Sequence, residues 1–472
     1  MAGRAITGEE QQLVDGLIDR ARAAMRLAET YDQAAVDRLI RGVAWAAGNE
    51  ATAARLAGMS VDESGMGSRE PTRRGKILGI LRDALREKSM GVIEEIPDKG
   101  IVKYAKPAGV IASLIPVTSP YVTPIGIAIY ALKCKDAVIF SPHPAARKTT
   151  AETVLVMRAV LERLGAPIDL LQCVERPTIP VATALMAGCD LTMATGGQPM
   201  VRAAYSSGKP AYGVGAGNAT MVIDETADIE EAARNTRISK TNDYGSGCSA
   251  DGNLLVDSRV YDAMLAQLQQ EGGYLVNPGE KDLLRAAYWD EQGRRTPDTI
   301  ARAADVVAAR AGFQLPSGKT FLIVEEERIG KPHLFSTEKL GTVLAIFKYH
   351  GFDDALDKVQ QIFDAGGKGH SCGIYSFDDD HIHRLALAAP VSRIMVRQIQ
   401  SRSNAGTFTN GMPMTSSMGC GIWGGNITNE NISLKHYMNV TWVSRPIPED
   451  RPSEEELFGE FYNSTISEMA ET

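Results

Sequence analysis

Between Gly109 and Gly197 the sequence alternates short apolar runs with amphipathic helical patterns, and this rhythm restricts the fold more than any other feature. The runs are short enough for buried strands, and "ARKTTAETVLVMRAVLERLG" has the spacing and length of a helix. Such alternation is typical of a parallel sheet with right-handed helical crossovers. The predicted strands are GVIASLI from Gly109, DAVIFSP from Asp136, LLQCVE from Leu170 and DLTMATGG from Asp190. We therefore predict a nucleotide-binding α/β domain.

Helices and a hairpin are predicted before the first strand, and one further strand is predicted near the C-terminus. Apolar residues recur at helical spacing from 13 to 25 and from 36 to 43, so these segments should pack as an N-terminal helical layer. A turn at Asp98-Lys99-Gly100 separates two alternating runs between 91 and 108, which predicts a β-hairpin. The segment HYMNVTWVSRP at 436–446 predicts one further strand.

Composition indicates an ordinary globular protein. With 472 residues, of which 44% are hydrophobic and 23% charged, the chain can bury sizeable cores, and its length suggests two to three domains. The net charge is -8 without a block of like charge, so nucleic acid is not a predicted partner. The N-terminus lacks a secretory apolar region, and no apolar stretch reaches the roughly 18 residues that span a bilayer. We predict no membrane partner and a cytoplasmic location.

The cysteines and histidines do not have the spacing of metal ligands. No CxxC pair occurs, so the cysteines are predicted to be reduced thiols. The pair of histidines in "HIH" at 381–383 should flank a surface helix, and we predict no metal. The six cysteines are Cys134, Cys173, Cys189, Cys248, Cys372 and Cys420. Only Cys248 and Cys420 lie in glycine-flanked turns.

Cys248 is the strongest candidate nucleophile. In "KTNDYGSGCSADGNLLV" its neighbours are glycine and serine, which leave room for a substrate and a cofactor. The alternative is a small core residue in a turn. A second glycine turn, at Gly196 and Gly197 in "ATGGQPMVRAAY", opens a helix whose free N–H groups suit a phosphate. It is not a GxGxxG motif, and a purely structural turn is the alternative.

Several motifs in order resemble the CoA-acylating branch of the aldehyde dehydrogenase superfamily. The resemblance runs from about Gly109 to Asn439, whereas the N-terminal helices match only in character. The chain is most similar to the sulfoacetaldehyde type of that branch. The motifs are "AAYSSGKPAYGVGAGN", "SKTNDYGSGCSADG", "STEKLGTVLAIFKY", "GGKGHSCGIYS" and "MGCGIWGGNITNENISLKHYMN".

The resemblance implies a reaction at Cys248. Its thiol would attack an aldehyde, the resulting thiohemiacetal would give a hydride to nicotinamide, and a thioester would remain. Hydrolytic relatives carry a Glu in the turn matching "GVGAGN", but no Asp or Glu occurs between Thr195 and Ile223. Coenzyme A should therefore release the acyl group, because a thiol needs less help than water. His370 in "GKGHSCG" is the candidate base; the alternative is a histidine hydrogen-bonded between strands.

The resemblance also assigns residues to the cofactor and the oxyanion. Glu338 matches the glutamate that binds the nicotinamide ribose, although an exposed Glu is the alternative. Thr195 and the two glycines after it fall beside the cofactor's phosphates or nicotinamide. Ser119 stands where relatives carry Asn, so the hydroxyl of Thr118 or Ser119 is expected to stabilise the oxyanion together with the backbone N–H of Cys248.

The dinucleotide is left open between NADP and NAD. The segment "IFSPHPAARKTT" places Ser141 and His143 beside the expected adenine ribose, with Arg147 and Lys148 following. No carboxylate there would repel a 2′-phosphate, so NADP is admissible. The two cations are equally suited to a phosphate of CoA, and a solvated first turn of a helix is the alternative.

Two arginines are candidate ligands for the substrate. Arg397 and Arg402 in "RIMVRQIQSRSNAG" occupy a loop that relatives fill with neutral residues, near the aldehyde end of the pocket. They would suit a carboxylate, phosphonate or sulfonate on a short aldehyde, possible substrates that include sulfoacetaldehyde. Solvation at the surface is the alternative for each.

The resemblance implies a three-part α/β fold. We expect a Rossmann-like nucleotide-binding domain (1–90 plus 109–213), an α/β catalytic domain (214–425) and a small bridging β-sheet (91–108 plus 426–460). A homodimer or homotetramer is expected from the family. Two other functions stay open: a hydrolytic NAD(P)-dependent semialdehyde dehydrogenase that makes a free acid, and a non-catalytic scaffold. Retention of Cys248, Glu338 and His370 argues against the scaffold.

Overall fold

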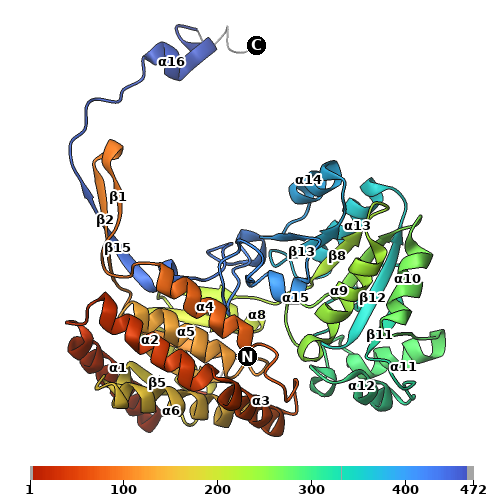
Figure 1. Cartoon of the computed structure of the whole chain (residues 1–472), viewed down its shortest axis with the longest axis horizontal. Helices are drawn as coiled ribbons and strands as arrows, with labels where there is room; N and C mark the ends of the chain where they lie inside the picture. Colours follow the sequence, from red (N-terminus) through yellow and green to blue (C-terminus); the bar gives the residue numbers. More distant parts are fainter. Residues whose placement is uncertain (1–3, 331, 465–472) are drawn as a thin grey trace.

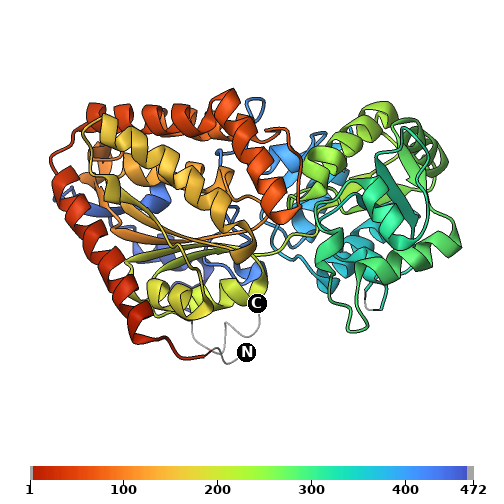
Figure 2. The ribbon, with the colours of Figure 1, turned by 90° about the horizontal axis from the view of Figure 1, so that it is seen from below.

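The computed structural model describes residues 4–330 and 332–464. Two α/β lobes lie side by side, and a three-stranded arm projects from the first lobe (Figure 1). The view from below in Figure 2 shows the same two lobes, with the N-terminal half of the chain in one and the segment after residue 220 building most of the other. No helix in the described residues combines the length and the apolar character needed to cross a membrane.

The first lobe is built on a five-stranded parallel sheet with the order β5-β4-β3-β6-β7. Every residue of its central strand, VIASLI, is buried, as expected for a parallel strand covered by helices on both faces. The predicted strands from Gly109, Asp136, Leu170 and Asp190 are confirmed. They are β3 (Val110–Ile115), β4 (Ala137–Pro142), β5 (Leu171–Cys173) and β6 (Leu191–Thr195), and β7 (Ala211–Val214) completes the sheet.

Helices pack on both faces of this sheet. The predicted N-terminal helices are present and longer than predicted, because Thr7 and Glu10 form a capping box that starts the first helix ahead of its apolar stripe. α5 is buried along its whole length, consistent with its nearly continuous apolar sequence. The helices of this lobe are α1 (Gly8–Ala28), α2 (Gln33–Gly48), α3 (Glu50–Ser64), α4 (Arg74–Arg86), α5 (Val122–Lys133), α6 (Arg147–Arg163), α7 (Ile179–Gly188) and α8 (Gln198–Tyr205).

The second lobe contains a seven-stranded sheet, again parallel throughout, with the order β10-β11-β12-β9-β8-β13-β14. Its strands are β8 (Thr220–Ile223), β9 (Asn253–Asp257), β10 (Gly273–Leu275), β11 (Phe321–Glu325), β12 (Val343–Tyr349), β13 (Cys372–Tyr375) and β14 (Ile394–Val396). Its helices are α9 (Ile229–Thr241), α10 (Tyr261–Gln270), α11 (Pro278–Tyr288), α12 (Ala304–Ala311), α13 (Phe352–Ala365), α14 (Asp379–Ala388) and α15 (Gln400–Ser403).

The arm is an antiparallel sheet with the order β1-β2-β15. β1 (Gly91–Ile96) and β2 (Ile101–Pro107) form the predicted hairpin, and Gly100 takes the left-handed conformation with φ 62 that the turn needs. β15 (Met438–Ser444) is the predicted C-terminal strand and leaves one edge of the sheet unpaired within the described chain. Beyond it the chain extends away from both lobes to α16 (Glu454–Phe458), at the top of Figure 1.

The domain boundaries remain a proposal. The five-stranded sheet ends with β7 at Val214 and the seven-stranded sheet begins at Thr220, which supports a division near residue 214. The chain returns to the first lobe before it reaches the arm, because Leu434 and Tyr437 are buried in the core of that lobe. We therefore propose that the second bridging segment begins near Met438 rather than at residue 426.

Candidate active site

A cavity of about 690 Å³ lies between the two lobes and is large enough for a substrate and a cofactor. Its walls come from segments far apart in the sequence: the first turn of α4, the loop after β3, the ends of β4 and β6, the turn before β9, and the segment from α15 to Met418. Of the residues predicted for the site, it is lined by Thr118, Ser119, His143, Thr195, Gly196, Gly197, Cys248, Glu338 and Arg402.

Cys248 lies in the turn that follows α9. Asp243 and Tyr244 have φ 50 and 51, a left-handed conformation that is unfavourable for residues other than glycine. An ion pair of 2.7 Å between Arg73 and Asp243 ties the turn to the first lobe, and the Asp243 carboxylate also accepts a hydrogen bond of 2.8 Å from Ser246 Oγ. These contacts hold the strained turn and direct Cys248 to the cavity.

The "GVGAGN" turn packs directly against Cys248. A Cβ atom at Gly217 would lie 2.1 Å from the carbonyl oxygen of Cys248, so no side chain fits there without moving the backbone. The N–H of Gly217 donates to Glu338 Oε1 at 2.9 Å. The turn thus links the nucleophile to the glutamate that was predicted to bind the ribose.

His370 contacts the Cys248 thiol. Its Nε2 lies 3.0 Å from Cys248 Sγ, and its Nδ1 lies 2.8 Å from Ser371 Oγ. The imidazole is fully buried, and this burial, together with the Arg393 guanidinium, lowers the pKa of His370 to about 3. The imidazole is therefore neutral near pH 7, with Nε2 free to accept a proton when Nδ1 donates to Ser371.

Arg393 holds the segment that carries this histidine. It is buried, and its guanidinium donates to three backbone carbonyl oxygens: to His370 at 2.8 Å, to Gly419 at 2.6 Å and to Asn429 at 3.0 Å. These bonds join the turn before β13 to the segment that leads back to the first lobe. They fix the position of the imidazole relative to Cys248.

The surroundings of Cys248 favour the protonated thiol over the thiolate. Burial raises its pKa to about 12, reinforced by Glu338 and Cys420 and opposed by Lys76 and Arg73. A thiol with a raised pKa beside an imidazole with a lowered pKa favours the neutral pair over the thiolate–imidazolium pair. If this thiol attacked a carbonyl carbon, proton transfer to His370 would accompany bond formation rather than precede it.

Glu338 lines the cavity. Its Oε2 accepts from Arg295 at 3.1 Å and its Oε1 from Gly217, which leaves a lone pair on each oxygen for a further donor. Burial raises the pKa of Glu338 above its usual range, while Arg295 acts in the opposite direction. This is the only carboxylate that lines the cavity in the described part of the chain.

Thr118 and Ser119 line the cavity at the end of β3, in the loop that faces Cys248. Neither hydroxyl is hydrogen-bonded to another described residue, and the backbone N–H of Cys248 also meets no acceptor in that part of the chain. Both kinds of donor predicted for the oxyanion are thus available in one cavity.

Only some of the residues predicted to bind the cofactor line the cavity. Gly196, Gly197 and His143 lie at the carboxyl ends of β6 and β4, where a parallel sheet binds nucleotides. Ser141 is buried inside β4 and does not line the cavity. Arg147 and Lys148 are exposed in the first turn of α6, outside the cavity lining.

Glu63 corrects the prediction that no carboxylate lies near this end of β4. It comes from α3 and accepts hydrogen bonds of 2.8 Å from the backbone N–H groups of Lys148 and Thr149, at the start of α6. Its other contact is the Thr149 hydroxyl at 2.9 Å. Glu63 was missed because 84 residues of sequence separate it from Lys148, and nothing in "VDESG" marks it as a helix cap for another segment.

The two candidate arginines are separated by the structure. Arg402, on α15, lines the cavity. Arg397 does not: its Nη1 donates to Ser376 O at 2.5 Å, and its guanidinium lies 4.3 Å from the centre of the Phe377 ring. The structure therefore does not bring Arg397 to the cavity, and its position gives no support to a role in substrate binding. Lys76, in the first turn of α4, does line the cavity and was missed, because a lysine among the basic residues of "TRRGKILGI" gives no local signal.

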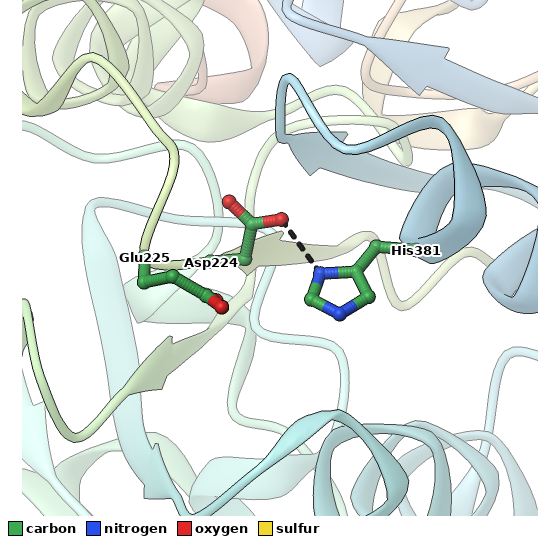
Figure 3. A group of neighbouring side chains, drawn as sticks. All are labelled: Asp224, Glu225 and His381. Carbon is green, nitrogen blue, oxygen red and sulfur yellow. Dashed lines mark hydrogen bonds and ion pairs between the residues drawn. The ribbon is translucent and has the colours of Figure 1, made fainter.

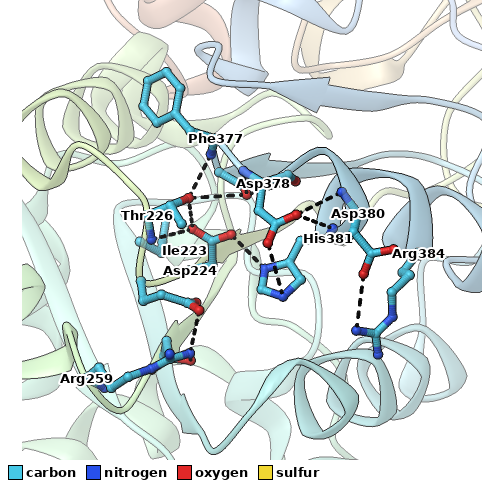
Figure 4. Close-up of polar contacts among 12 residues, drawn as sticks. Ile223, Asp224, Thr226, Arg259, Phe377, Asp378, Asp380, His381 and Arg384 are labelled. Carbon is cyan, nitrogen blue, oxygen red and sulfur yellow. Dashed lines mark hydrogen bonds and ion pairs between the residues drawn. The ribbon is translucent and has the colours of Figure 1, made fainter.

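One group of metal-capable side chains occurs in the described residues, away from the cavity (Figure 3): Asp224, Glu225 and His381. Each of the three side chains already has a protein partner (Figure 4), although Glu225 Oε2 has no hydrogen-bond partner in the described chain. The Asp224 carboxylate bonds His381 Nδ1 at 2.9 Å and Thr226 Oγ1 at 2.7 Å, and Glu225 pairs with Arg259 at 2.8 Å. A guanidinium beside the cluster opposes cation binding, so the cluster is a structural hydrogen-bond network.

The chain matches known proteins over nearly its whole length. Residues 5–283 match the aldehyde dehydrogenase family. The chain is 41% identical over 451 residues to the sulfoacetaldehyde dehydrogenase of an Acholeplasma species, with 94% of this chain and 93% of that protein covered. It is 39% identical to the acylating sulfoacetaldehyde dehydrogenase of Bilophila wadsworthia, with coverage of 94% and 97%. The solved acetylating aldehyde dehydrogenase of Geobacillus thermoglucosidasius is 35% identical, with a TM-score of 0.89 and coverage of 94% and 99%.

These matches confirm the fold class predicted from the sequence, with two parallel α/β units and a small separate sheet. A cysteine on a strained turn, facing a cavity between two parallel sheets, is where such a fold places a nucleophile within reach of a nucleotide. By its sequence and its fold, this protein belongs to the aldehyde dehydrogenase family.

Proposed function

We propose that this protein is an acylating aldehyde dehydrogenase, which converts an aldehyde, CoA and NAD(P)+ into an acyl-CoA and NAD(P)H. The observation that carries the proposal is the Cys248–His370 contact of 3.0 Å at a cavity lined by no carboxylate other than Glu338 among the described residues. The pair supplies a nucleophile and a base, and the cavity lacks a free carboxylate that could act as a base on water. The names of the relatives that cover almost the whole chain support the same reaction.

The first half of the reaction makes a thioester on Cys248. The thiol sulfur attacks the aldehyde carbon while His370 Nε2 accepts the thiol proton. The carbonyl oxygen becomes an oxyanion beside the backbone N–H of Cys248 and the Thr118 or Ser119 hydroxyl, which are donors held in place before the reaction. A nicotinamide held at the ends of β4 and β6 would supply the acceptor for the hydride on the former aldehyde carbon, which would leave a thioester on Cys248.

The second half transfers the acyl group to CoA. His370 must first release to solvent the proton that it took from Cys248. It then accepts the proton of the CoA thiol, the CoA sulfur attacks the thioester carbon, and Cys248 leaves as a thiolate that takes this proton back from His370. Water is a poor competitor because Glu338 is ion-paired with Arg295 and receives the Gly217 N–H, so its carboxylate is committed to positioning. A hydrolytic semialdehyde dehydrogenase is the second candidate, and it would need Glu338 to act as the base.

We assign the cofactor to the ends of β4 and β6. His143, Gly196 and Gly197 would lie along the dinucleotide, and Glu338 would accept from the ribose hydroxyls. NAD and NADP both remain compatible. Arg147 and Lys148 favour a 2′-phosphate or a CoA phosphate, whereas the Glu63 carboxylate at the same helix end opposes one.

We also propose that the aldehyde is short and anionic, sulfoacetaldehyde being the leading choice, and that the protein is a cytoplasmic homodimer or dimer of dimers. The arm supports oligomers, since the free edge of β15 carries exposed Val440, Trp442 and Val443. The reduced state of all six cysteines suits a reducing compartment.

The proposal is tested by the rate of NAD(P)H formation from sulfoacetaldehyde with and without CoA. Steady turnover is expected only with CoA, and a burst of at most one equivalent per Cys248 is expected without it. Continuous turnover that is indifferent to CoA would instead support the hydrolytic enzyme. The Cys248→Ala variant is the control and should show neither burst nor turnover.

A further inference from the structure

The charged side chains that line the cavity are not all paired with an opposite charge. Within the described chain, four cationic side chains and one anionic side chain line it: Arg73, Lys76, Arg295, Arg402 and Glu338. Two of the cations are neutralised, because Arg73 pairs with Asp243 at 2.7 Å and Arg295 pairs with Glu338 at 3.1 Å. The cavity therefore retains two cations without a counter-charge.

These two cations are Lys76 and Arg402. Neither side chain forms a hydrogen bond or an ion pair with another described residue, although the Lys76 side chain is half-buried. Burial and the neighbouring Arg73 lower the pKa of Lys76 to about 8, which means that its ammonium is poorly solvated where it lies. A partly buried ammonium without an acceptor is unusual unless a ligand completes its environment.

Both cations line the cavity from elements that pack against each other. α4, which carries Lys76, packs against the segment that follows α15: the backbone N–H of Met414 donates to Asp83 at 2.9 Å, and the Arg82 guanidinium lies 5.0 Å from the centre of the Phe408 ring. Lys76 lies near enough to Cys248 to lower the pKa of its thiol, against the effect of burial. An anion bound by Lys76 would therefore lie beside the thiol, as the head group of a short aldehyde would.

We propose that Lys76, together with Arg402, binds the anionic head group of the aldehyde and makes this cavity selective for aldehydes that carry a sulfonate or a carboxylate. The inference rests on the proposed function and names its substrate class. The ammonium of Lys76 and the fork of Arg402 would each donate to head-group oxygens, while the aldehyde carbon faces Cys248. Phe408 and Met414 also line the cavity and offer apolar surface to the carbon chain between head group and aldehyde.

The kinetic test compares charged and neutral aldehydes of similar size. We expect Lys76→Gln to lower kcat/KM for sulfoacetaldehyde by about tenfold or more, with propionaldehyde changed by less than about threefold. Lys76→Arg should restore most of the loss, and Arg402→Gln should show the same selectivity. Succinate semialdehyde tells a carboxylate from a sulfonate preference. Arg86→Gln is the matched control, because Arg86 lies exposed on the same helix outside the cavity.

An equal loss for both aldehydes in Lys76→Gln would overturn the inference and assign Lys76 to the reactivity of Cys248. Binding of isethionate to the Cys248→Ala protein, measured by calorimetry, keeps the test independent of turnover. The Lys76→Gln change should weaken that binding by about tenfold, and unchanged binding would overturn the inference. Lys76-dependent isethionate binding without CoA-dependent turnover would contradict the proposed function and leave the anion site standing.

Discussion

We expect activity to require glycine at position 217, because this residue packs against the backbone of Cys248. An added Cβ would lie 2.1 Å from the Cys248 carbonyl oxygen and 2.9 Å from its carbonyl carbon, where 3.4 Å is the lower end of ordinary contact. Gly217→Ala must therefore displace one of the two backbones by about 1 Å, and a misplacement of that size costs about 100-fold in rate. Because both contacted atoms are backbone atoms, no side-chain rotation relieves the overlap.

The assay for Gly217→Ala is kcat/KM in the CoA-dependent reaction, together with the melting temperature and the far-UV spectrum. We expect a fall of about 100-fold with the fold retained. Gly252→Ala is the matched control: it follows the same turn, but its Cβ would find its nearest atoms at 3.4 and 3.5 Å, so activity should be kept. A Gly217→Ala enzyme with more than about a third of wild-type activity would refute the packing argument.

The site yields four further predictions. Because burial raises the pKa of Cys248 to about 12 and lowers that of His370 to about 3, alkylation of Cys248 by iodoacetamide should rise about tenfold per pH unit up to about pH 10; a plateau near pH 7 would indicate an ion pair instead. His370→Ala should lower kcat by about 100-fold or more at pH 7.5, and a loss under about threefold would rule it out as the base. Arg397→Ala should leave KM for sulfoacetaldehyde unchanged within about twofold, and a large rise would mean that Arg397 reaches the substrate after all. Glu63→Gln should raise kcat/KM with NADP relative to NAD by about threefold or more, whereas an unchanged ratio would separate Glu63 from cofactor choice.

The parts of the fold that could be predicted are those encoded over short distances. Four of the five strands of the first sheet are short apolar runs between helical patterns, and these four were predicted at their observed places, whereas β7 was not predicted. The candidate nucleophile could also be named, because glycine and serine around Cys248 are a local signal of access. The structure adds that this turn is strained at Asp243 and Tyr244, which propensity does not reveal.

The parts that could not be predicted depend on contacts across the chain. His370 was proposed as a base from its motif, but its distance of 3.0 Å to Cys248 Sγ depends on the fold of the 121 residues between them. Lys76 and Glu63 lie on helices that pack beside the cavity and beside α6, and neither has a neighbour in sequence that signals its position. The position of Arg397 outside the cavity could not be predicted for the same reason: its charge was visible, but the direction set by a backbone φ of 50 was not.

The central claim is that Cys248 carries the acyl group and that CoA, rather than water, removes it. Mass spectrometry of the enzyme after mixing with sulfoacetaldehyde and NAD(P)+ in the absence of CoA tests this directly. The account predicts a sulfoacetyl group on the peptide that contains Cys248, stable until CoA is added and then recovered as sulfoacetyl-CoA. An unmodified Cys248 with free sulfoacetate accumulating in the same mixture would contradict it.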